Sequence, residues 1–318
     1  MNRVLVTGGA GFIGSHLVDA LVGDFEVTVL DDLSTGSEEY IRPHMSTDGF
    51  RFIRGTVVSE EDVKRALDGV DTVFHFAAQP DVRLSVERPL WDFKVNVHGS
   101  IMVLDRAREA GIKRFIFASS GGTVYGDRPE TPTRENCVLR PVSNYGASKA
   151  AVEMYLSSYS ELYGMHAVSL RLANVVGPRS THGVIHDFYM RLREDASRLL
   201  VLGTGTQEKS YLYVSDAVNA TLILANKMPK GFTPINVSSG ERLRVSEIAD
   251  MVVRELAPGA KIEYTGSERG WPGDVVTTDI DVSLLKSLGW HPEVSIREGI
   301  YRYLQWLKER YGPIHTSS

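Results

Sequence analysis

Short runs of apolar residues alternate with polar stretches along the first half of the chain. The runs predict buried strands at Val4–Val6, Val27–Leu30, Phe50–Ile53, Thr72–Phe76, Phe115–Ala118 and Ala167–Leu172. Between them, apolar residues at helical spacing predict helices, among them one from about Glu60 to Leu67 and one that ends near Ala110. Strands that alternate with helices predict an α/β fold with a doubly wound parallel sheet.

The pattern loosens beyond Asn174, where glycines and prolines separate shorter elements. Ile235–Val237 still reads as a strand that returns to the main sheet. We therefore predict a first domain over residues 1–174, with a return segment over 210–237. The rest of 175–318 is expected to form a smaller C-terminal α/β lobe that binds substrate.

A glycine-rich turn follows the first predicted strand. Thr7–Gly14 runs from this strand into a helical pattern through Leu17. Gly8 permits a tight turn, Gly11 lets the backbone approach a pyrophosphate, and Gly14 lets the helix pack closely on the strand. The helix N-terminus offers N–H donors to phosphate. This combination predicts a dinucleotide site on a Rossmann-type sheet.

Asp31 ends the second predicted strand, about 20 residues beyond the glycines, where a carboxylate holds the ribose hydroxyls of a dinucleotide. The same charge repels a 2′-phosphate. The sequence therefore favours NAD over NADP.

Tyr145 and Lys149 stand four residues apart, a spacing that places both on one face of a helix. A phenol normally titrates near ~10, so it is a poor base at neutral pH unless a cation stabilises the phenolate. Lys149 is the candidate for that cation, and the two residues form a candidate proton-transfer pair.

The composition is that of an ordinary globular protein. The 318 residues carry a formal net charge of −5, with a pI near 6.0, so neither nucleic acid nor an anionic membrane is expected as a partner. Cys137 is the single cysteine, and no apolar run approaches the ~18 residues of a membrane span. We expect a cytoplasmic location. No metal site is expected, because His182 and His186 lack a third ligand nearby and His75 continues an apolar strand.

Several motifs together resemble the extended short-chain dehydrogenases/reductases, and within them the UDP-glucose (UDP-galactose) 4-epimerases. The motifs are Thr7–Gly14, Asp31–Gly36, His75–Ala78, Asn96, Ser119–Gly126, Tyr145–Lys149, Asn174–Pro178 and Pro272–Asp274. The resemblance implies NAD-dependent 4-epimerisation of a UDP-hexose through a 4-keto intermediate. UDP-glucose and UDP-galactose are the first candidates, followed by UDP-GlcNAc and UDP-GalNAc.

The resemblance also implies roles for individual residues. Tyr145 is the expected base and acid, and Lys149 is expected to bond the nicotinamide ribose and to lower the pKa of the phenol. The implied NAD contacts are Gly8, Gly11, Phe12, Ile13, Gly14, Asp31, Asp32, Ser34, Thr35, Gly36, Thr56, Val57, Phe76, Ala77, Ala78, Asn96, Ser119, Tyr145, Lys149 and Leu172. The implied substrate contacts are Ser120, Gly121, Thr123, Tyr145, Asn174, Val184, Lys209, Arg269, Asp274 and Thr278.

The chain departs from the family pattern at the third catalytic position. Gly121 stands where these epimerases usually carry a serine, which leaves Thr123 and Ser120 as open candidates for the hydroxyl. The related dehydratases carry an Asp-Glu pair before Val-Tyr-Gly, and this stretch has no acid. Epimerisation is therefore favoured over dehydration.

Further departures concern binding. Thr56 and Val57 replace the usual residues that meet adenine, and Lys209 replaces an arginine that binds the diphosphate, which leaves Arg269 as the expected diphosphate partner. Thr278 stands where a bulky aromatic often covers the sugar, a change that would leave room for an N-acetyl group.

Three alternatives remain open at this point: a UDP-glucuronate 4-epimerase, another sugar-nucleotide dehydratase or reductase, and a non-catalytic NAD-binding sensor. The sequence does not rank the UDP-sugars or reveal the pathway. In the family, the helix that carries the tyrosine and the helix ending near Ala110 form a dimer interface, so a homodimer is expected.

Overall fold

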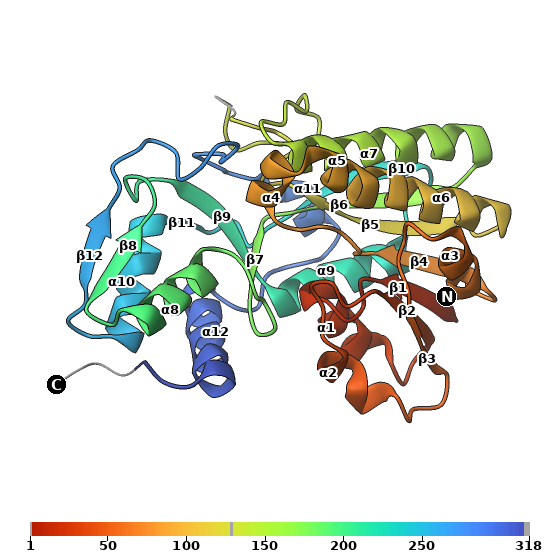
Figure 1. Ribbon diagram of the computed structural model, residues 1–318. Helices are drawn as coiled ribbons and strands as arrows, with labels where there is room; N and C mark the ends of the chain where they lie inside the picture. The colour runs from red at the N-terminus through yellow and green to blue at the C-terminus, as the bar shows by residue number, and fades with distance from the viewer. Residues whose placement is uncertain (1, 128–129, 315–318) are drawn as a thin grey trace.

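The computed structural model describes residues 2–127 and 130–314, which form a large sheet domain and a smaller lobe (Figure 1). The strands are β1 (Arg3–Thr7), β2 (Glu26–Asp31), β3 (Phe50–Arg54), β4 (Thr72–His75), β5 (Arg114–Ser120), β6 (His166–Leu172), β7 (Asn174–Val176), β8 (Arg198–Val201), β9 (Glu208–Tyr213), β10 (Phe232–Val237), β11 (Arg242–Arg244) and β12 (Lys261–Tyr264). The α-helices are α1 (Phe12–Leu21), α2 (Glu38–Ile41), α3 (Glu60–Leu67), α4 (Val82–Glu87), α5 (Pro89–Asp92), α6 (Ser100–Glu109), α7 (Asn144–Tyr163), α8 (Val184–Glu194), α9 (Val214–Lys227), α10 (Val245–Leu256), α11 (Ser283–Ser287) and α12 (Ile296–Tyr311). A 3₁₀ turn, η1 (Arg42–His44), and a π-helical stretch, η2 (Phe93–Gly99), complete the set.

The main sheet has seven strands in the order β10-β6-β5-β4-β1-β2-β3, and all of its strand pairs are parallel. This confirms the predicted doubly wound α/β fold. The strand order reverses between β1 and β4. In such sheets ligands bind outside the carboxyl ends of the strands at this reversal.

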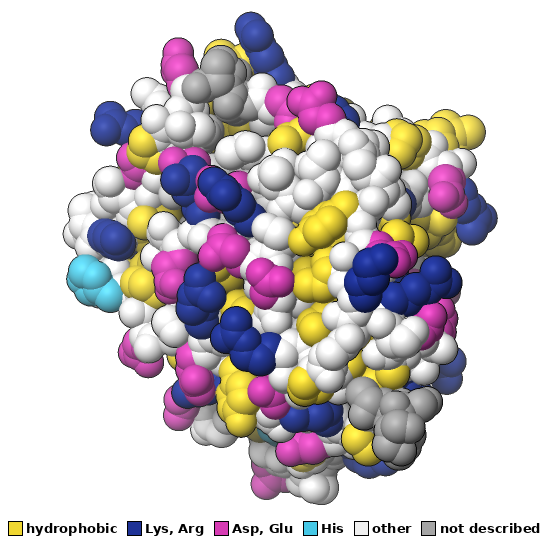
Figure 2. All heavy atoms as spheres, turned by 90° about the vertical axis from the view of Figure 1, so that its left-hand side faces the viewer, with side chains coloured by type: hydrophobic (Ala, Val, Ile, Leu, Met, Phe, Trp, Pro, Cys, Tyr) yellow, Lys and Arg dark blue, Asp and Glu magenta, His cyan; other side chains and the backbone are white. Residues whose placement is uncertain are grey.

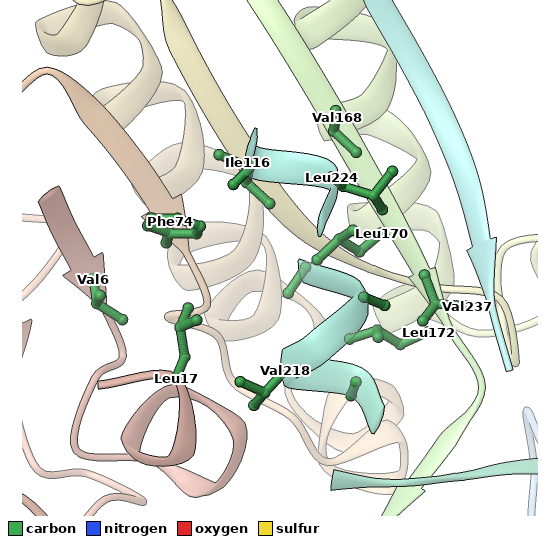
Figure 3. Close-up of a cluster of buried hydrophobic side chains, with 14 of the residues drawn as sticks. Val6, Leu17, Phe74, Ile116, Val168, Leu170, Leu172, Val218, Leu224 and Val237 are labelled. Carbon is green, nitrogen blue, oxygen red and sulfur yellow. The ribbon is translucent and has the colours of Figure 1, made fainter. Parts of the chain in front are cut away.

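Both faces of the sheet are buried because helices cover them, and successive side chains of a strand point to opposite faces. Val4 and Val6 of β1 pack with α1 and α9 on one face, and Figure 3 shows Leu17 and Val218 from these helices meeting the strand side chains. Leu5 points to the other face and joins the core formed with α3, α6 and α7. The apolar runs of the sequence therefore read as continuous rather than alternating.

The segment predicted to return to the main sheet is divided between the two parts of the structure. Helix α9 packs on the same face as α1, and β10 pairs with β6 at the sheet edge. Strand β9 instead pairs with β7 and β11 in a three-stranded sheet. The chain therefore crosses between the two parts more than once after Asn174.

The smaller lobe has its own core, to which α8, α10, α12, β8 and β9 contribute. Strands β8 and β12 form a parallel pair at its far end. Figure 2 looks onto this end and shows Lys and Arg side chains standing among Asp and Glu side chains. Charges of both signs are mixed on this face.

Candidate active site

A cavity of about 430 Å³ lies where the sheet domain meets the smaller lobe. Its lining includes Gly8 after β1, Phe76 after β4 and Ser119 at the end of β5. Val184 of α8 and Lys209 of β9 line it from the smaller lobe. The cavity is thus at the strand-order reversal and is shared by the two parts of the structure.

The turn over Thr7–Gly14 has two positions, Gly8 and Gly14, where any side chain would collide with the backbone, and we call this turn the cradle. Gly8 adopts a φ of +71°, and a Cβ there would lie 2.6 Å from the backbone nitrogen of Ala77. A Cβ at Gly14 would lie 2.1 Å from the carbonyl oxygen of Gly8. Helix α1 has no side-chain cap at Gly11, so its first N–H groups are available to an anion. This geometry fits the pyrophosphate of a dinucleotide.

Asp31 stands at the end of β2 and lines the same cavity. Its Oδ2 accepts a hydrogen bond from Ala10 N at 2.9 Å, and its Oδ1 accepts one from Leu33 N at 2.8 Å. Each carboxylate oxygen retains a lone pair for a ribose hydroxyl. The two backbone bonds hold the carboxylate in place, so the position suits the adenine ribose of NAD.

Tyr145 and Lys149 lie one turn apart near the start of α7, and both line the cavity. The helix is capped by Ser143, whose Oγ accepts a hydrogen bond from Gly146 N at 3.1 Å. Lys149 Nζ donates to the carbonyl oxygen of Ala118 on β5 at 2.8 Å. The cap and this bond fix the pair against the end of the sheet.

Burial dominates the electrostatics of the pair. It raises the pKa of Tyr145, and the nearby charge of Asp92 raises it further. Burial also lowers the pKa of Lys149 to about 8, an effect that Asp92 opposes. Lys149 Nζ stands 5.6 Å from the centre of the Tyr145 ring. In the protein alone, burial and Asp92 therefore raise the phenol pKa, and the expected lowering by Lys149 stays a prediction for the enzyme that holds NAD.

The departure at Gly121 has a steric cause. A Cβ at this position would lie 2.7 Å from the carbonyl oxygen of Arg171, so a serine could fit only if the backbone moved. Two hydroxyl side chains nearby, Ser120 and Thr123, line the cavity. The Oγ1 of Thr123 is buried and has no hydrogen-bond partner among the described residues.

The expected substrate contacts of the smaller lobe are held by polar bonds. Lys209 Nζ pairs with Asp274 Oδ1 at 2.8 Å, and both residues line the cavity. Burial lowers the pKa of Lys209, while the carboxylate of Asp274 opposes this effect. Asn174 Nδ2 donates to the carbonyl oxygen of Ser210 at 3.1 Å. These contacts tie β7, β9 and the 274 segment into one wall of the cavity.

Most of the expected cofactor and substrate residues line the cavity, and five do not. The residues outside the lining are Gly36, Asn96, Gly121, Arg269 and Thr278. Arg269 is bonded to the Asp127 carboxylate and to the carbonyl oxygen of Asp274. Thr278 Oγ1 accepts a hydrogen bond from Ser210 N at 2.7 Å. Thr278 therefore supports β9, and the room that it was expected to leave for an N-acetyl group stays a prediction.

Asn96 lies in η2, behind the loop that follows β4. Its Oδ1 accepts a hydrogen bond from Gln79 N at 2.8 Å, and its Nδ2 donates to Asp92 Oδ1 at 2.8 Å. Both ends of the amide are therefore occupied by protein groups. A π-helical turn of this kind is often found beside a functional site.

Several lining residues were not among the expected contacts, and three of them are polar or aromatic side chains with notable partners. Arg191 lies on α8, two turns beyond Val184, and donates to the carbonyl oxygen of Leu200. Arg83 stands 5.7 Å above the Trp271 ring, whose Nε1 is buried without a partner among the described residues. The helical spacing from Val184 to Arg191 is the signal in the sequence that could have found Arg191.

The histidines singled out in the sequence are not grouped as metal ligands within the described part of the chain, and His75 is held by hydrogen bonds within the protein. His75 Nδ1 bonds Thr7 Oγ1 at 2.7 Å and its Nε2 bonds Ser100 Oγ at 2.8 Å, while burial lowers its pKa to about 3. His182 precedes α8, so it does not share that helix with His186. Over residues 2–127 and 130–314, no group of three or more His, Cys, Asp or Glu side chains is placed to hold a metal ion.

Comparisons with known proteins agree with this geometry. The profile of the "NAD dependent epimerase/dehydratase family" matches residues 4–238. The chain belongs to this family. Its seven-stranded sheet and glycine turn are those of an extended short-chain dehydrogenase/reductase.

Relatives within the family include proteins named as 4-epimerases and proteins named as 4,6-dehydratases. The chain is 34% identical to the UDP-glucose 4-epimerase of Mycolicibacterium smegmatis, over 97% of this chain and 99% of that one. It is 31% identical to the dTDP-D-glucose 4,6-dehydratase of Mus musculus, over 98% and 90% of the two chains. A crystal structure of the Thermus thermophilus UDP-glucose 4-epimerase in complex with NAD superimposes with a TM-score of 0.86, at 36% identity, over 96% and 99% of the chains.

Family membership makes this protein an NAD-dependent enzyme of the epimerase/dehydratase type, and its cofactor is NAD. Among the described residues, no helix is both long and apolar enough to cross a bilayer.

Proposed function

We propose that this enzyme inverts C4 of a UDP-hexose, with UDP-glucose and UDP-galactose as its first substrates. Tyr145 takes the proton of the 4-hydroxyl and later returns it to the 4-keto oxygen. NAD, when bound, accepts the C4 hydride and returns it to the opposite face. Lys149 holds the nicotinamide ribose and places its positive charge beside the phenol that must ionise. The cradle of Gly8 and Gly14 holds the pyrophosphate.

The observation that carries the choice of epimerisation is the composition of the turn beyond β5. Elimination of water from C6 needs an acid that protonates the departing hydroxyl. The residues that follow Ser120 are Gly121, Gly122 and Thr123, and none of them is an acid. Epimerisation requires only the phenol, the ammonium group and NAD, and both side chains line the cavity.

An extra carboxylate on the sugar is not favoured by the charges in the cavity. Arg83 lines it, but its guanidinium already pairs with Asp187 at 3.3 Å and stands 3.6 Å from Asp81. A UDP-glucuronate would have to compete with these carboxylates. An uncharged hexose fits the arrangement better.

A substrate panel tests the proposed function. Purified protein is incubated separately with UDP-Gal, UDP-GalNAc and UDP-GlcA, and the 4-epimer is followed by NMR alongside NADH absorbance. We expect conversion of UDP-Gal without net NADH. A stable 4-keto-6-deoxy product would instead establish a dehydratase. If none of the three substrates were converted, a non-catalytic NAD sensor would be favoured.

The hydroxyl that assists Tyr145 is assigned by comparing two variants. We propose Thr123, because its Oγ1 is buried beside the cavity without a partner among the described residues. Thr123→Val keeps the shape and removes this donor, and we expect kcat to fall about 100-fold. Ser120→Ala is the matched control and should lower kcat less than about fivefold. A large loss in Ser120→Ala with a small loss in Thr123→Val would reverse the assignment.

We also propose a homodimer built on α6 and α7, which lie side by side on one face of the sheet (Figure 1). Large apolar side chains are exposed on α7 and on the segment that precedes α6, including Leu90 (83% exposed), Phe93 (56%), Met154 (55%) and Leu162 (67%). Exposed apolar side chains gathered on adjacent helices are typical of an interface.

A cytoplasmic location, consistent with the single Cys137, remains part of the proposal.

Light scattering tests the dimer. The wild type should show twice the 35.2 kDa mass of one chain, and the double variant Phe93→Glu, Leu162→Glu should show the mass of one. Leu284→Glu changes an exposed leucine on α11 and serves as the control, which should leave the dimer intact. A monomeric wild type, or a dimeric double variant, would contradict the proposed interface.

A further inference from the structure

Asp92 is a fully buried carboxylate at the junction of α5 and η2, and it does not line the cavity. Its Oδ2 accepts a hydrogen bond from Ser148 Oγ at 2.6 Å. Its Oδ1 accepts bonds from Asn96 Nδ2 at 2.8 Å and from Gln79 Nε2 at 3.2 Å. Three neutral donors from three different segments therefore converge on one acid.

This arrangement is unusual because a buried charge is normally paired with an opposite charge. None of the ion pairs found over residues 2–127 and 130–314 involves Asp92. The two oxygens of a carboxylate can accept all three of these hydrogen bonds. An asparagine would make much of the same hydrogen bonding without burying a charge. The hydrogen bonds alone therefore do not explain why an acid stands at this position.

The charge acts on the catalytic pair. Ser148, which bonds Asp92, immediately precedes Lys149 on α7. Asp92 raises the pKa of Lys149 against the effect of burial, and it also raises the pKa of Tyr145. Asp92 is the charged group that acts on both residues.

The other groups that face Lys149 supply no unpaired negative charge. From β5 it meets the Phe117 ring, with Nζ 4.9 Å from the ring centre, and the carbonyl oxygen of Ala118. From β4, His75 is kept neutral by burial and by the charge of Lys149, since both lower its pKa. On α7 itself the neighbours are the neutral phenol of Tyr145 and, one turn further along, the Glu153 carboxylate, whose charge is paired with Arg171 at 2.6 Å.

We propose that Asp92 is a positioning residue for the catalytic pair: its buried carboxylate ties the start of α7 to η2, and its negative charge keeps Lys149 an ammonium ion in the desolvated site. This inference rests on the proposed role of Lys149 as the working cation. Asp92 acts through Lys149 and Tyr145 rather than by touching the substrate.

Two variants separate the charge of Asp92 from its bonds. Asp92→Asn removes the charge and keeps the shape, whereas Ser148→Ala removes one bond and keeps the charge. Loss of the charge lowers the pKa of both Lys149 and Tyr145. Each of the two groups sets one limb of the kcat profile, so both limbs move down. We expect the kcat profile of Asp92→Asn to shift by about one pH unit to lower pH.

The Ser148→Ala profile should keep the wild-type position even if kcat falls. An Asp92→Asn profile that overlays the wild type, or an equal shift in Ser148→Ala, would overturn the proposal, since a purely structural role changes the height of the profile and not its position. If Asp92→Asn does not fold, Asp92→Ser removes the same charge with a smaller side chain and is expected to give the same shift.

A second measurement does not depend on turnover. The ε-carbon of Lys149 is titrated by NMR in protein labelled with ¹³C-lysine, and its signal is assigned by its loss in Lys149→Met. We expect a midpoint near pH 8 in the wild type and about one unit lower in Asp92→Asn. An unchanged midpoint overturns the role of Asp92 even in an active enzyme. A shifted midpoint in a protein that converts no UDP-sugar would support Asp92 and refute the proposed function.

Discussion

Tyr145→Phe is expected to lower kcat by about 10³–10⁴-fold, the largest loss for any single side chain of the site. The variant keeps the ring that packs in the wall of the cavity and removes only the hydroxyl that exchanges a proton with the sugar 4-hydroxyl. No protein hydrogen bond of this hydroxyl is found among the described residues. The melting temperature and the NAD content should therefore stay near those of the wild type.

The matched control is Tyr155→Phe, which makes the same change on an exposed tyrosine of the same helix. It should leave kcat within about twofold of the wild type, as expected for a surface change away from the site. If Tyr145→Phe retained more than about a tenth of the wild-type kcat, a different group would have to move the proton.

The second large effect is expected from Gly14→Ala. The added Cβ would stand 2.1 Å from the carbonyl oxygen of Gly8 and 3.0 Å from Gly9 Cα, so the turn must open before the variant can fold. Overpacking of this kind costs about 1–3 kcal/mol of folding free energy. The displaced turn no longer presents its N–H groups to the pyrophosphate, so NAD should be lost on gel filtration.

Gly23→Ala is the control for this prediction. Gly23 has a φ of +102°, but nothing lies within 4 Å of the position of its Cβ. Its substitution should cost about 1 kcal/mol from backbone strain alone, and NAD should remain bound. Calorimetry and the NAD content of the purified variants measure both effects. Full NAD occupancy in Gly14→Ala would contradict the assigned pyrophosphate cradle.

The sheet domain could be predicted from the sequence because its signals are local. Apolar runs located β1, β2 and β3 to within a residue or two, and the spacing between Glu60 and Leu67 gave the bounds of α3. The glycine turn could be predicted equally well, since each glycine is required by the close approach of a neighbouring backbone segment. Elements whose two sides are both buried leave a strong pattern in a short stretch of sequence.

The walls of the cavity were harder to predict, because they depend on which distant segments meet. Arg269 and Thr278 were expected at the substrate, but neither lines the cavity, and both bond protein groups instead. Arg191 and Trp271 line the cavity although no motif marks them. The raised pKa of Tyr145 was missed for a related reason, since burial depends on the packing of the whole site.

One labelling experiment tests the central claim most directly. The enzyme is incubated with UDP-galactose that carries deuterium at C4, and the product is examined by NMR and mass spectrometry. If NAD takes up and returns the C4 hydride while Tyr145 moves the hydroxyl proton, UDP-glucose should form with the deuterium still at C4. Loss of the label to solvent, or a 4-keto-6-deoxy product, would contradict the proposed 4-epimerisation.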